Sequence, residues 1–131
     1  MLVVAATASL SSLAQAQTPI PTRTPLATFA IAPAKTVSRV ETTRVDFLPG
    51  QSMPTHMHTV PVICFVSKGD LVVKIGDAAE RPAPLGAVTY EGAGVTVHYF
   101  RNASATQPAQ LECAVLAGPD DKVLNVMLPQ P

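Results

Sequence analysis

The chain has little charge and no excess of either sign. Nine Lys and Arg residues balance nine Asp and Glu residues, and charged residues make up 14% of the 131 positions, against about 25% in an ordinary soluble domain. Without a basic excess, binding to nucleic-acid phosphates or to anionic lipid is not indicated. Hydrophobic residues reach 47%, which argues against disorder. The composition therefore indicates a compact domain whose partners do not include nucleic acid.

The composition also disfavours long uninterrupted helices. The chain contains 13 prolines, about twice the usual share, and proline breaks helices in their interior. The length fits one domain, since domains commonly have about 100–150 residues. A single β-rich domain is the simplest prediction.

The first 16 residues carry no charge and read MLVVAATASLSSLAQA. Their apolar stretch is too short to span a bilayer, and Ala14–Gln15–Ala16 is a small-x-small pattern that signal peptidase accepts. We interpret residues 1–16 as a signal peptide and expect a periplasmic or secreted protein with no membrane attachment after cleavage. A basic residue usually opens such a peptide, whereas the first one here is Arg23, so an unprocessed N-terminal arm remains the alternative.

The remainder divides into a proline-rich arm at 17–34, a globular domain at 35–128 and a short tail at 129–131. In the domain, apolar residues recur with period two, which predicts strands. Ser67–Asp70 lies between two apolar runs and predicts a hairpin turn. The pattern indicates an all-β antiparallel sandwich or barrel, with strands at residues 36–48, 59–66, 71–75, 87–91, 95–101, 111–117 and 122–128.

The chain has only three histidines, and their spacing indicates a metal site. His56 and His58 are two residues apart, so strand alternation places both side chains on one face. His98 lies in another predicted strand and could supply a third ligand across a barrel. Three such ligands leave further coordination positions open. The alternative is three histidines without a shared task.

The sequence resembles the cupin family over most of the mature chain. The family's first motif is Gly, five residues, His-x-His, three or four residues, Glu, six residues, Gly. In this chain Gly50, His56 and His58 match the motif, and Val62 stands in the place of the glutamate. The second motif is Gly, five residues, Pro-x-Gly, two residues, His, three residues, Asn. Gly86 and Gly94 match, but three residues instead of two precede His98, and Asn102 follows.

The resemblance implies a cupin-type antiparallel β-barrel (a double-stranded β-helix or jelly roll) that holds a divalent metal on His56, His58 and His98. Iron is the first expectation, with Mn, Ni, Cu or Zn as alternatives. Because Val62 cannot bind a cation, three neutral imidazoles would leave the metal's charge intact and favour anionic or enolate ligands. The same valine equally fits a degenerate site that holds little metal.

Several neighbouring residues are secondary candidates. Glu91 is a weak candidate for a catalytic base, although a solvated loop carboxylate is the favoured interpretation. The residues expected to line the pocket are Val62, Cys64, Thr96 and Phe100.

The two cysteines, Cys64 and Cys113, are predicted either to form a disulfide in an exported protein or to remain as two buried thiols. Cys64 as a soft metal ligand is a third possibility.

Two functions remain open. The first is an exported iron-dependent oxygenase of a small anionic or enolisable substrate. The second is a non-catalytic periplasmic cupin that binds a small ligand or a metal. A homodimer formed through sheet edges is expected in both cases, with the apolar arm able to pack on a neighbouring subunit.

Overall fold

The computed structural model describes residues 20–130 and shows no helix among them. The predicted signal peptide and the start of the arm lie outside the described residues. Nine strands follow in chain order: β1 (Arg39–Phe47), β2 (His56–His58), β3 (Val62–Lys68), β4 (Leu71–Ile75), β5 (Arg81–Ala83), β6 (Val88–Glu91), β7 (Thr96–Asn102), β8 (Ala109–Ala117) and β9 (Asn125–Met127).

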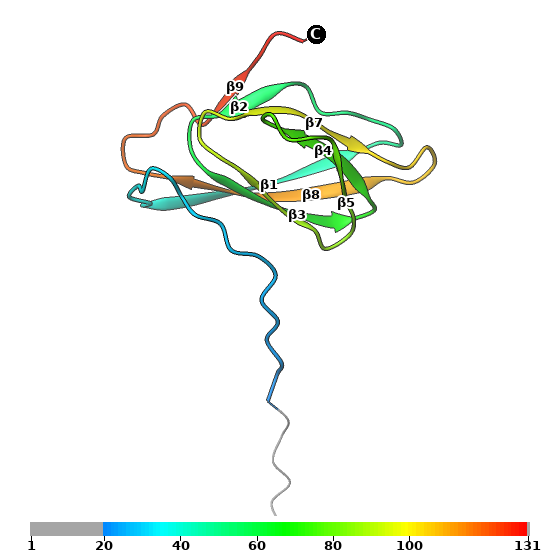
Figure 1. Ribbon diagram of the computed structural model, residues 1–131, viewed down its shortest axis with the longest axis horizontal. Coiled ribbons are helices and arrows are strands. Elements are labelled where there is room, and N and C mark those ends of the chain that lie inside the picture. Colours follow the sequence, from blue (N-terminus) through cyan, green and yellow to red (C-terminus); the bar gives the residue numbers. More distant parts are fainter. Residues whose placement is uncertain (1–19, 131) are drawn as a thin grey trace, which may run out of the picture.

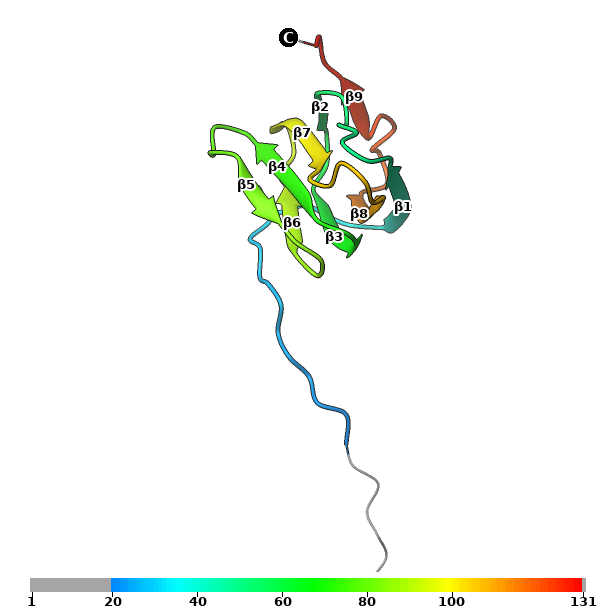
Figure 2. The same ribbon diagram turned by 90° about the vertical axis from the view of Figure 1, so that its right-hand side faces the viewer.

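The strands form two antiparallel sheets that face each other (Figures 1 and 2). One sheet has the order β1-β8-β3-β6 and the other the order β5-β4-β7-β2-β9. The chain passes repeatedly from one sheet to the other, as in a double-stranded β-helix. The all-β antiparallel fold class predicted from the sequence is confirmed.

Two short strands were not predicted separately. β2 has three residues and β5 has three, too few for alternation to show. β5 contains Pro82 and lies at the edge of its sheet, where the missing N–H costs no ladder bond.

The predicted hairpin at Ser67–Asp70 is wrong. The turn exists, with Gly69 at φ 66°, but β3 and β4 belong to different sheets and do not pair. A Cβ on Gly69 would lie 3.0 Å from the carbonyl oxygen of Pro108, so the close approach of the two segments favours glycine as well.

Inward-facing side chains fill the space between the sheets. On β3 the fully buried residues alternate, with Val62, Cys64 and Val66 inside and Phe65 exposed. Val62 and Cys64, both expected from the sequence to line the pocket, thus point inward. The other members of the core include Phe47, Leu71, Val73, Val97, Phe100 and Leu111.

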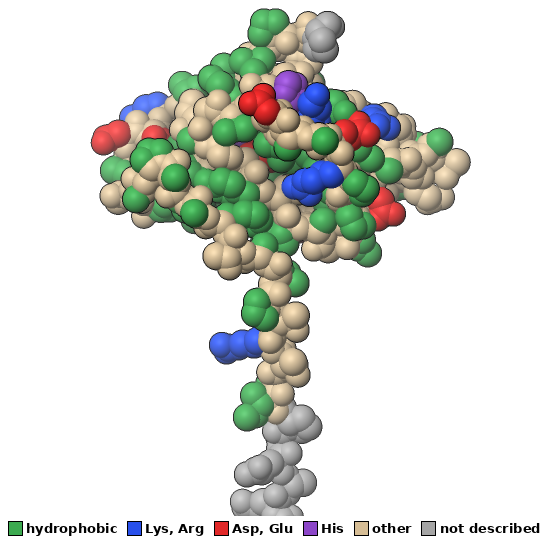
Figure 3. All heavy atoms as spheres, in the orientation of Figure 1, with side chains coloured by type: hydrophobic (Ala, Val, Ile, Leu, Met, Phe, Trp, Pro, Cys, Tyr) green, Lys and Arg blue, Asp and Glu red, His purple; other side chains and the backbone are tan. Residues whose placement is uncertain are grey.

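The described part of the arm extends away from the two sheets (Figures 1 and 2). Ile20 and Leu26 are exposed, while Phe29 stacks on Tyr90 of β6 with ring centroids 5.3 Å apart. On the face shown in Figure 3, charged side chains are scattered among apolar and uncharged ones. Residues 20–130 include no helix with the length and apolarity needed to cross a membrane.

Candidate metal centre

His56 and His58 lie on β2, between β7 and β9 in the five-stranded sheet. Their rings are 5.1 Å apart in an edge-to-face arrangement. His56 is buried and His58 is half-buried. This confirms the prediction from the sequence that strand alternation places the two imidazoles on one face.

Each imidazole is oriented by a backbone carbonyl. His56 Nδ1 lies 2.8 Å from the Pro54 oxygen, and His58 Nδ1 lies 3.1 Å from the Leu124 oxygen. A carbonyl can only accept, so both Nδ1 atoms carry hydrogen and donate. In the neutral rings the lone pair is therefore on Nε2, the atom that would bind a cation.

Glu91 completes the group. Nε2 of His58 is 3.0 Å from Glu91 Oε2, and Nε2 of His56 is 3.8 Å from the same oxygen. One ligand atom from each of the three residues lies within 4.8 Å of the other two. Glu91 is 2% exposed, so the expectation of a solvated loop carboxylate is wrong.

The register of the sheet explains why a carboxylate occurs here. Glu91 ends β6 and is the direct partner of Val62 on β3, so both side chains point into the space between the sheets. Val62 occupies the motif position where the family resemblance expects a glutamate. The carboxylate missing from that position is supplied by the adjacent strand.

The contacts of Glu91 fit a cation. Oε2 is buried and has no hydrogen-bond partner, because the neutral imidazoles that face it carry no hydrogen on Nε2. A buried carboxylate oxygen without a donor is costly. Two imidazole nitrogens and a carboxylate are suitable ligands for a divalent transition metal, so these residues fit such an ion.

In the metal-free protein the pKa values of Glu91 and His56 are shifted by their surroundings. Burial alone would raise the pKa of Glu91, but the two histidines outweigh it and hold that pKa below its usual value. Burial would lower the pKa of His56, but Glu91 and the Pro54 carbonyl outweigh it and raise that pKa above its usual value. The apo site therefore favours an imidazolium–carboxylate pair, which a metal would replace.

This pair predicts a pH optimum for the stability of the metal-free protein. The lowered pKa of Glu91 stabilises the fold above about pH 4.3, and this gain is lost as the pH falls further. The raised pKa of His56 stabilises the fold below about pH 6.5, and this gain is lost as the pH rises. In EDTA, the wild type should therefore have a higher Tm than Glu91→Gln, and the difference in Tm should be largest between these two pH values. A difference that keeps growing up to pH 9 would contradict the pairing.

His98 is not part of this group. Val97 is the direct partner of His56 and is fully buried, so the neighbouring His98 side chain points to the opposite face of the sheet. A register shift between β4 and β7 leaves His98 without a partner on β4. The motif's usual two-residue spacing after Gly94 ends at Val97, and the extra residue moves the histidine out of the site.

A cavity of about 450 Å³ adjoins the three candidate ligands. Of the residues predicted to line it, Val62 does so. Cys64, Thr96 and Phe100 do not. Cys64 and Phe100 are fully buried in the core, and Thr96, opposite Met57, lies on the face away from His56. The walls also include Val45, Met53, Leu111, Val115, Leu124 and Met127.

Cys64 and Cys113 form a disulfide, the first of the alternatives left open by the sequence. The two residues are direct partners on β3 and β8. Cys113 lines the cavity, while Cys64 is fully buried and its Sγ lies 3.2 Å from Glu91 Oε1. The disulfide is thus in contact with the carboxylate of the candidate metal site.

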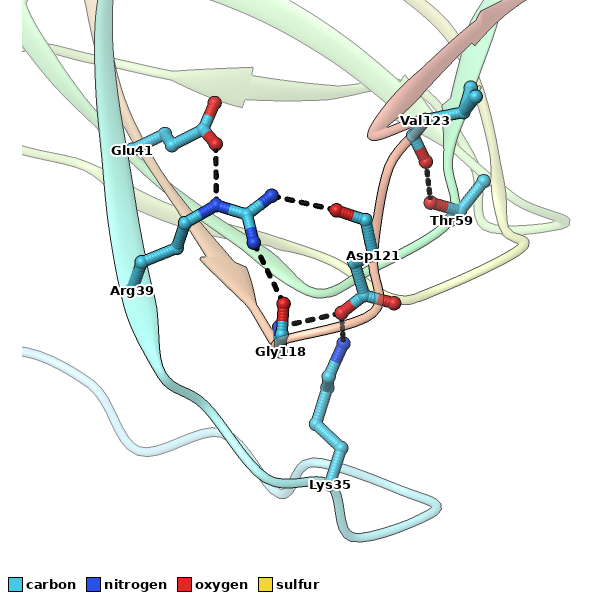
Figure 4. Close-up of polar contacts among 7 residues, drawn as sticks. All are labelled: Lys35, Arg39, Glu41, Thr59, Gly118, Asp121 and Val123. Carbon is cyan, nitrogen blue, oxygen red and sulfur yellow. Dashed lines mark hydrogen bonds and ion pairs between the residues drawn. The ribbon is translucent and has the colours of Figure 1, made fainter.

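The segment between β8 and β9, which supplies the carbonyl for His58, is fixed by polar contacts (Figure 4). Asp121 pairs with Lys35 and accepts from the Gly118 amide. Arg39 donates to the carbonyls of Gly118 and Asp121.

A further contact fixes the same segment beside the histidines. Thr59, next to His58, donates to the Val123 carbonyl. These contacts hold Leu124 at the site.

Loosening this segment should weaken metal binding. Asp121→Ala removes the Lys35 pair and the contact with the Gly118 amide, so the Leu124 carbonyl should orient His58 less well. We expect metal affinity to fall roughly 10-fold, the low end of the effect of outer-shell partners. Asp120→Ala, which removes an exposed acid next to it, is the matched control in the same calorimetric titration. Equal affinities for the two variants would contradict the positioning role.

The fold and the His-His-Glu group together define a β-barrel protein with metal-binding capacity. The family description "Cupin domain" matches residues 43–115. The chain therefore belongs to the cupin family, as the sequence motifs indicated. Curated protein sequences gave no match.

Solved structures with the same fold include enzymes. An oxalate oxidase in complex with the substrate analogue glycolate is 26% identical, with a TM-score of 0.58 over 69% of this chain and 46% of its own. A sugar phosphate isomerase of the cupin superfamily from Silicibacter pomeroyi is 26% identical, with a TM-score of 0.54 over 63% of this chain and 53% of its own. This chain thus spans about half the length of these neighbours.

A third neighbour supports the fold alone. It is an RmlC-like cupin with a double-stranded β-helix fold from Methanocaldococcus jannaschii, 18% identical, with a TM-score of 0.55 over 61% of this chain and 72% of its own.

Proposed function

We propose that this protein is an exported, metal-dependent oxygenase of a small enolisable compound, with Fe²⁺ as the first candidate metal. The observation that carries the proposal is the His56, His58 and Glu91 group at the wall of a cavity. Two histidines and one carboxylate with open positions are the donor set of non-haem iron oxygenases. The oxalate oxidase neighbour supports oxidative chemistry on this fold.

The residues of the chain have distinct tasks in this proposal. His56 and His58 hold the cation through Nε2, and the Pro54 and Leu124 carbonyls keep the rings in that orientation. Glu91 cancels one of the cation's two charges. When bound, Fe²⁺ would supply Lewis acidity towards a substrate oxygen and electrons for dioxygen chemistry.

The cavity favours an apolar substrate with no more than one negative charge. Its lining contains two carboxylates, Glu41 and Glu91, and neither Lys nor Arg. A dianion such as oxalate would find no cationic side chain among these residues, while the apolar walls can bury hydrocarbon. An enolisable diketone or a phenol brings one donor oxygen and an apolar body.

A non-catalytic binding protein is the second candidate. Glu91 is the buried carboxylate among the described residues, and it is already engaged with the two histidines. The lining therefore offers no separate buried acid or base for proton transfer, which favours simple ligand or metal binding.

Metal content and oxygen uptake distinguish the two candidates. Protein purified from its native host should contain iron near one equivalent by plasma mass spectrometry. An oxygen electrode should then record uptake with acetylacetone or a phenolic acid and none with oxalate. Bound metal without uptake on any diketone, thiol or phenolic acid supports the second candidate, and protein without metal contradicts the first.

Export and dimerisation belong to the same proposal. The exposed Leu26 of the extended arm provides apolar surface for a second copy of the chain. Light scattering should give the mass of a dimer for residues 17–131 and of a monomer after deletion of residues 17–34. A monomer in both cases would contradict this part.

A further inference from the structure

The Glu91 carboxylate lies between two groups of possible ligands. Oε2 faces the histidines, and Oε1 lies 3.2 Å from Cys64 Sγ. A disulfide sulfur carries no hydrogen, so this sulfur cannot donate to Oε1. Cys64, Cys113 and Glu91 also each offer one ligand atom within 4.8 Å of the other two. The buried carboxylate therefore joins two potential cation sites.

The sheet, rather than the disulfide bond, holds the two cysteines together. Their strands pair on both sides of them, with Val62 opposite Val115 and Val66 opposite Leu111. Glu91 is fixed by its own pairing with Val62. After reduction, the backbone ladder would keep both thiols beside each other and beside the carboxylate.

We propose that reduction of the Cys64–Cys113 disulfide creates a second cation site, made of the two thiolates and Glu91, for a thiophilic divalent metal such as Zn²⁺. Thiolates select such soft or borderline cations. The site goes beyond the histidine centre and does not require that centre to be catalytic. The thiolate site shares Glu91 with the histidine centre, so a cation bound at one site changes the electrostatic potential at the other.

The chemistry balances with an external dithiol as the reductant. Its thiolate attacks Cys113 Sγ, because Cys113 is the cysteine that lines the cavity. Cys64 leaves as a thiolate, which takes a proton from water. The second thiol of the reductant then displaces Cys113 and closes the reductant's own disulfide. Two protein thiols result, and binding of the divalent cation releases both of their protons.

Reduction of the disulfide and binding of Zn²⁺ are thermodynamically linked. If reduction raises the affinity for Zn²⁺ by a given factor, Zn²⁺ favours the reduced form by the same factor. Zinc should therefore make the disulfide easier to reduce. In a glutathione redox buffer, the fraction of reduced protein should rise on addition of Zn²⁺.

Cobalt absorption tests the site directly. Wild-type protein, oxidised or reduced by a phosphine that does not compete as a thiol, is titrated with Co²⁺. Near-ultraviolet thiolate-to-cobalt charge transfer should appear in the reduced protein only. Zn²⁺ should displace that cobalt, with an affinity at least about 10-fold above that of the oxidised protein because thiolates are added as ligands.

Variants separate this site from the histidine centre. Cys64→Ser/Cys113→Ser should bind Co²⁺ without charge transfer in either redox condition. His56→Ala/His58→Ala should lose binding in the oxidised form and keep charge transfer after reduction, even if the histidine centre has no catalytic task. Glu91→Gln should weaken cobalt binding to the reduced form.

Two results would overturn the proposal. One is a reduced wild-type protein that keeps its far-ultraviolet circular dichroism but shows no charge transfer with Co²⁺. The other is loss of the native circular dichroism on reduction, both with and without Zn²⁺, since the site requires the paired strands.

Discussion

Glu91→Gln is expected to reduce metal affinity by at least about 100-fold, because loss of an outer-shell partner alone costs ~10–100-fold and Glu91 is itself placed as a ligand. Glutamine keeps the shape of the side chain but brings no negative charge to balance the cation. Calorimetric titration of the metal-free protein with Fe²⁺ or Co²⁺, under argon, measures the change.

His98→Ala is the matched comparison for this prediction. His98 lies on the strand next to His56 and His58 but outside their group, so its removal should change the affinity less than about 3-fold, within the usual scatter of single contributions. The three-histidine arrangement expected from the sequence motifs makes the opposite prediction. Strong loss in His98→Ala with little change in Glu91→Gln would show that the histidine set is the correct one.

Reduction of the disulfide is expected to produce the largest change in stability. The bridge joins residues 49 positions apart, and a closed loop of that length corresponds to about 4 kcal/mol in the chain-entropy treatment, at the upper end of the typical ~2–4 kcal/mol. At roughly 4–8 °C per kcal/mol for a domain of this size, we expect Tm to fall by more than 10 °C.

The measurement compares oxidised and reduced metal-free protein by differential scanning calorimetry. Cys64→Ser/Cys113→Ser should show a comparable loss, with no further change on adding the reductant. Zn²⁺ should recover more of the loss in the reduced wild type than in the double variant, where only the histidine centre remains to bind it. A Tm that does not change on reduction would contradict a stabilising role for the bridge.

The sequence was sufficient for the fold and for two of the three candidate ligands. Strand alternation and turn residues predicted most of the strands, because both patterns depend only on residues that are close together in the chain. Alternation likewise brought His56 and His58 to one face. The pairing of Cys64 with Cys113 was one of three open alternatives, since no local feature shows which strands are neighbours.

The third ligand could not be obtained in the same way. Glu91 reaches the site only because β6 pairs with β3 in the register that places it opposite Val62, and register is a property of the tertiary structure. His98 misses the site because of a one-residue register shift. The extra residue before His98 was the available signal. For Glu91 the alternation was misleading, because the apolar Val88 and Tyr90 of its strand suggest that Glu91 faces outward, whereas Thr89 and Glu91 are the buried pair.

Anomalous X-ray diffraction from crystals soaked in Fe²⁺ or Co²⁺ tests the central claim most directly. One anomalous peak is expected between His56 Nε2, His58 Nε2 and the Glu91 carboxylate, within about 2.0–2.2 Å of each ligand atom, the range known for comparable zinc–nitrogen and zinc–oxygen bonds. A peak bonded to His98, or fully soaked crystals without a peak at Glu91, would contradict the account.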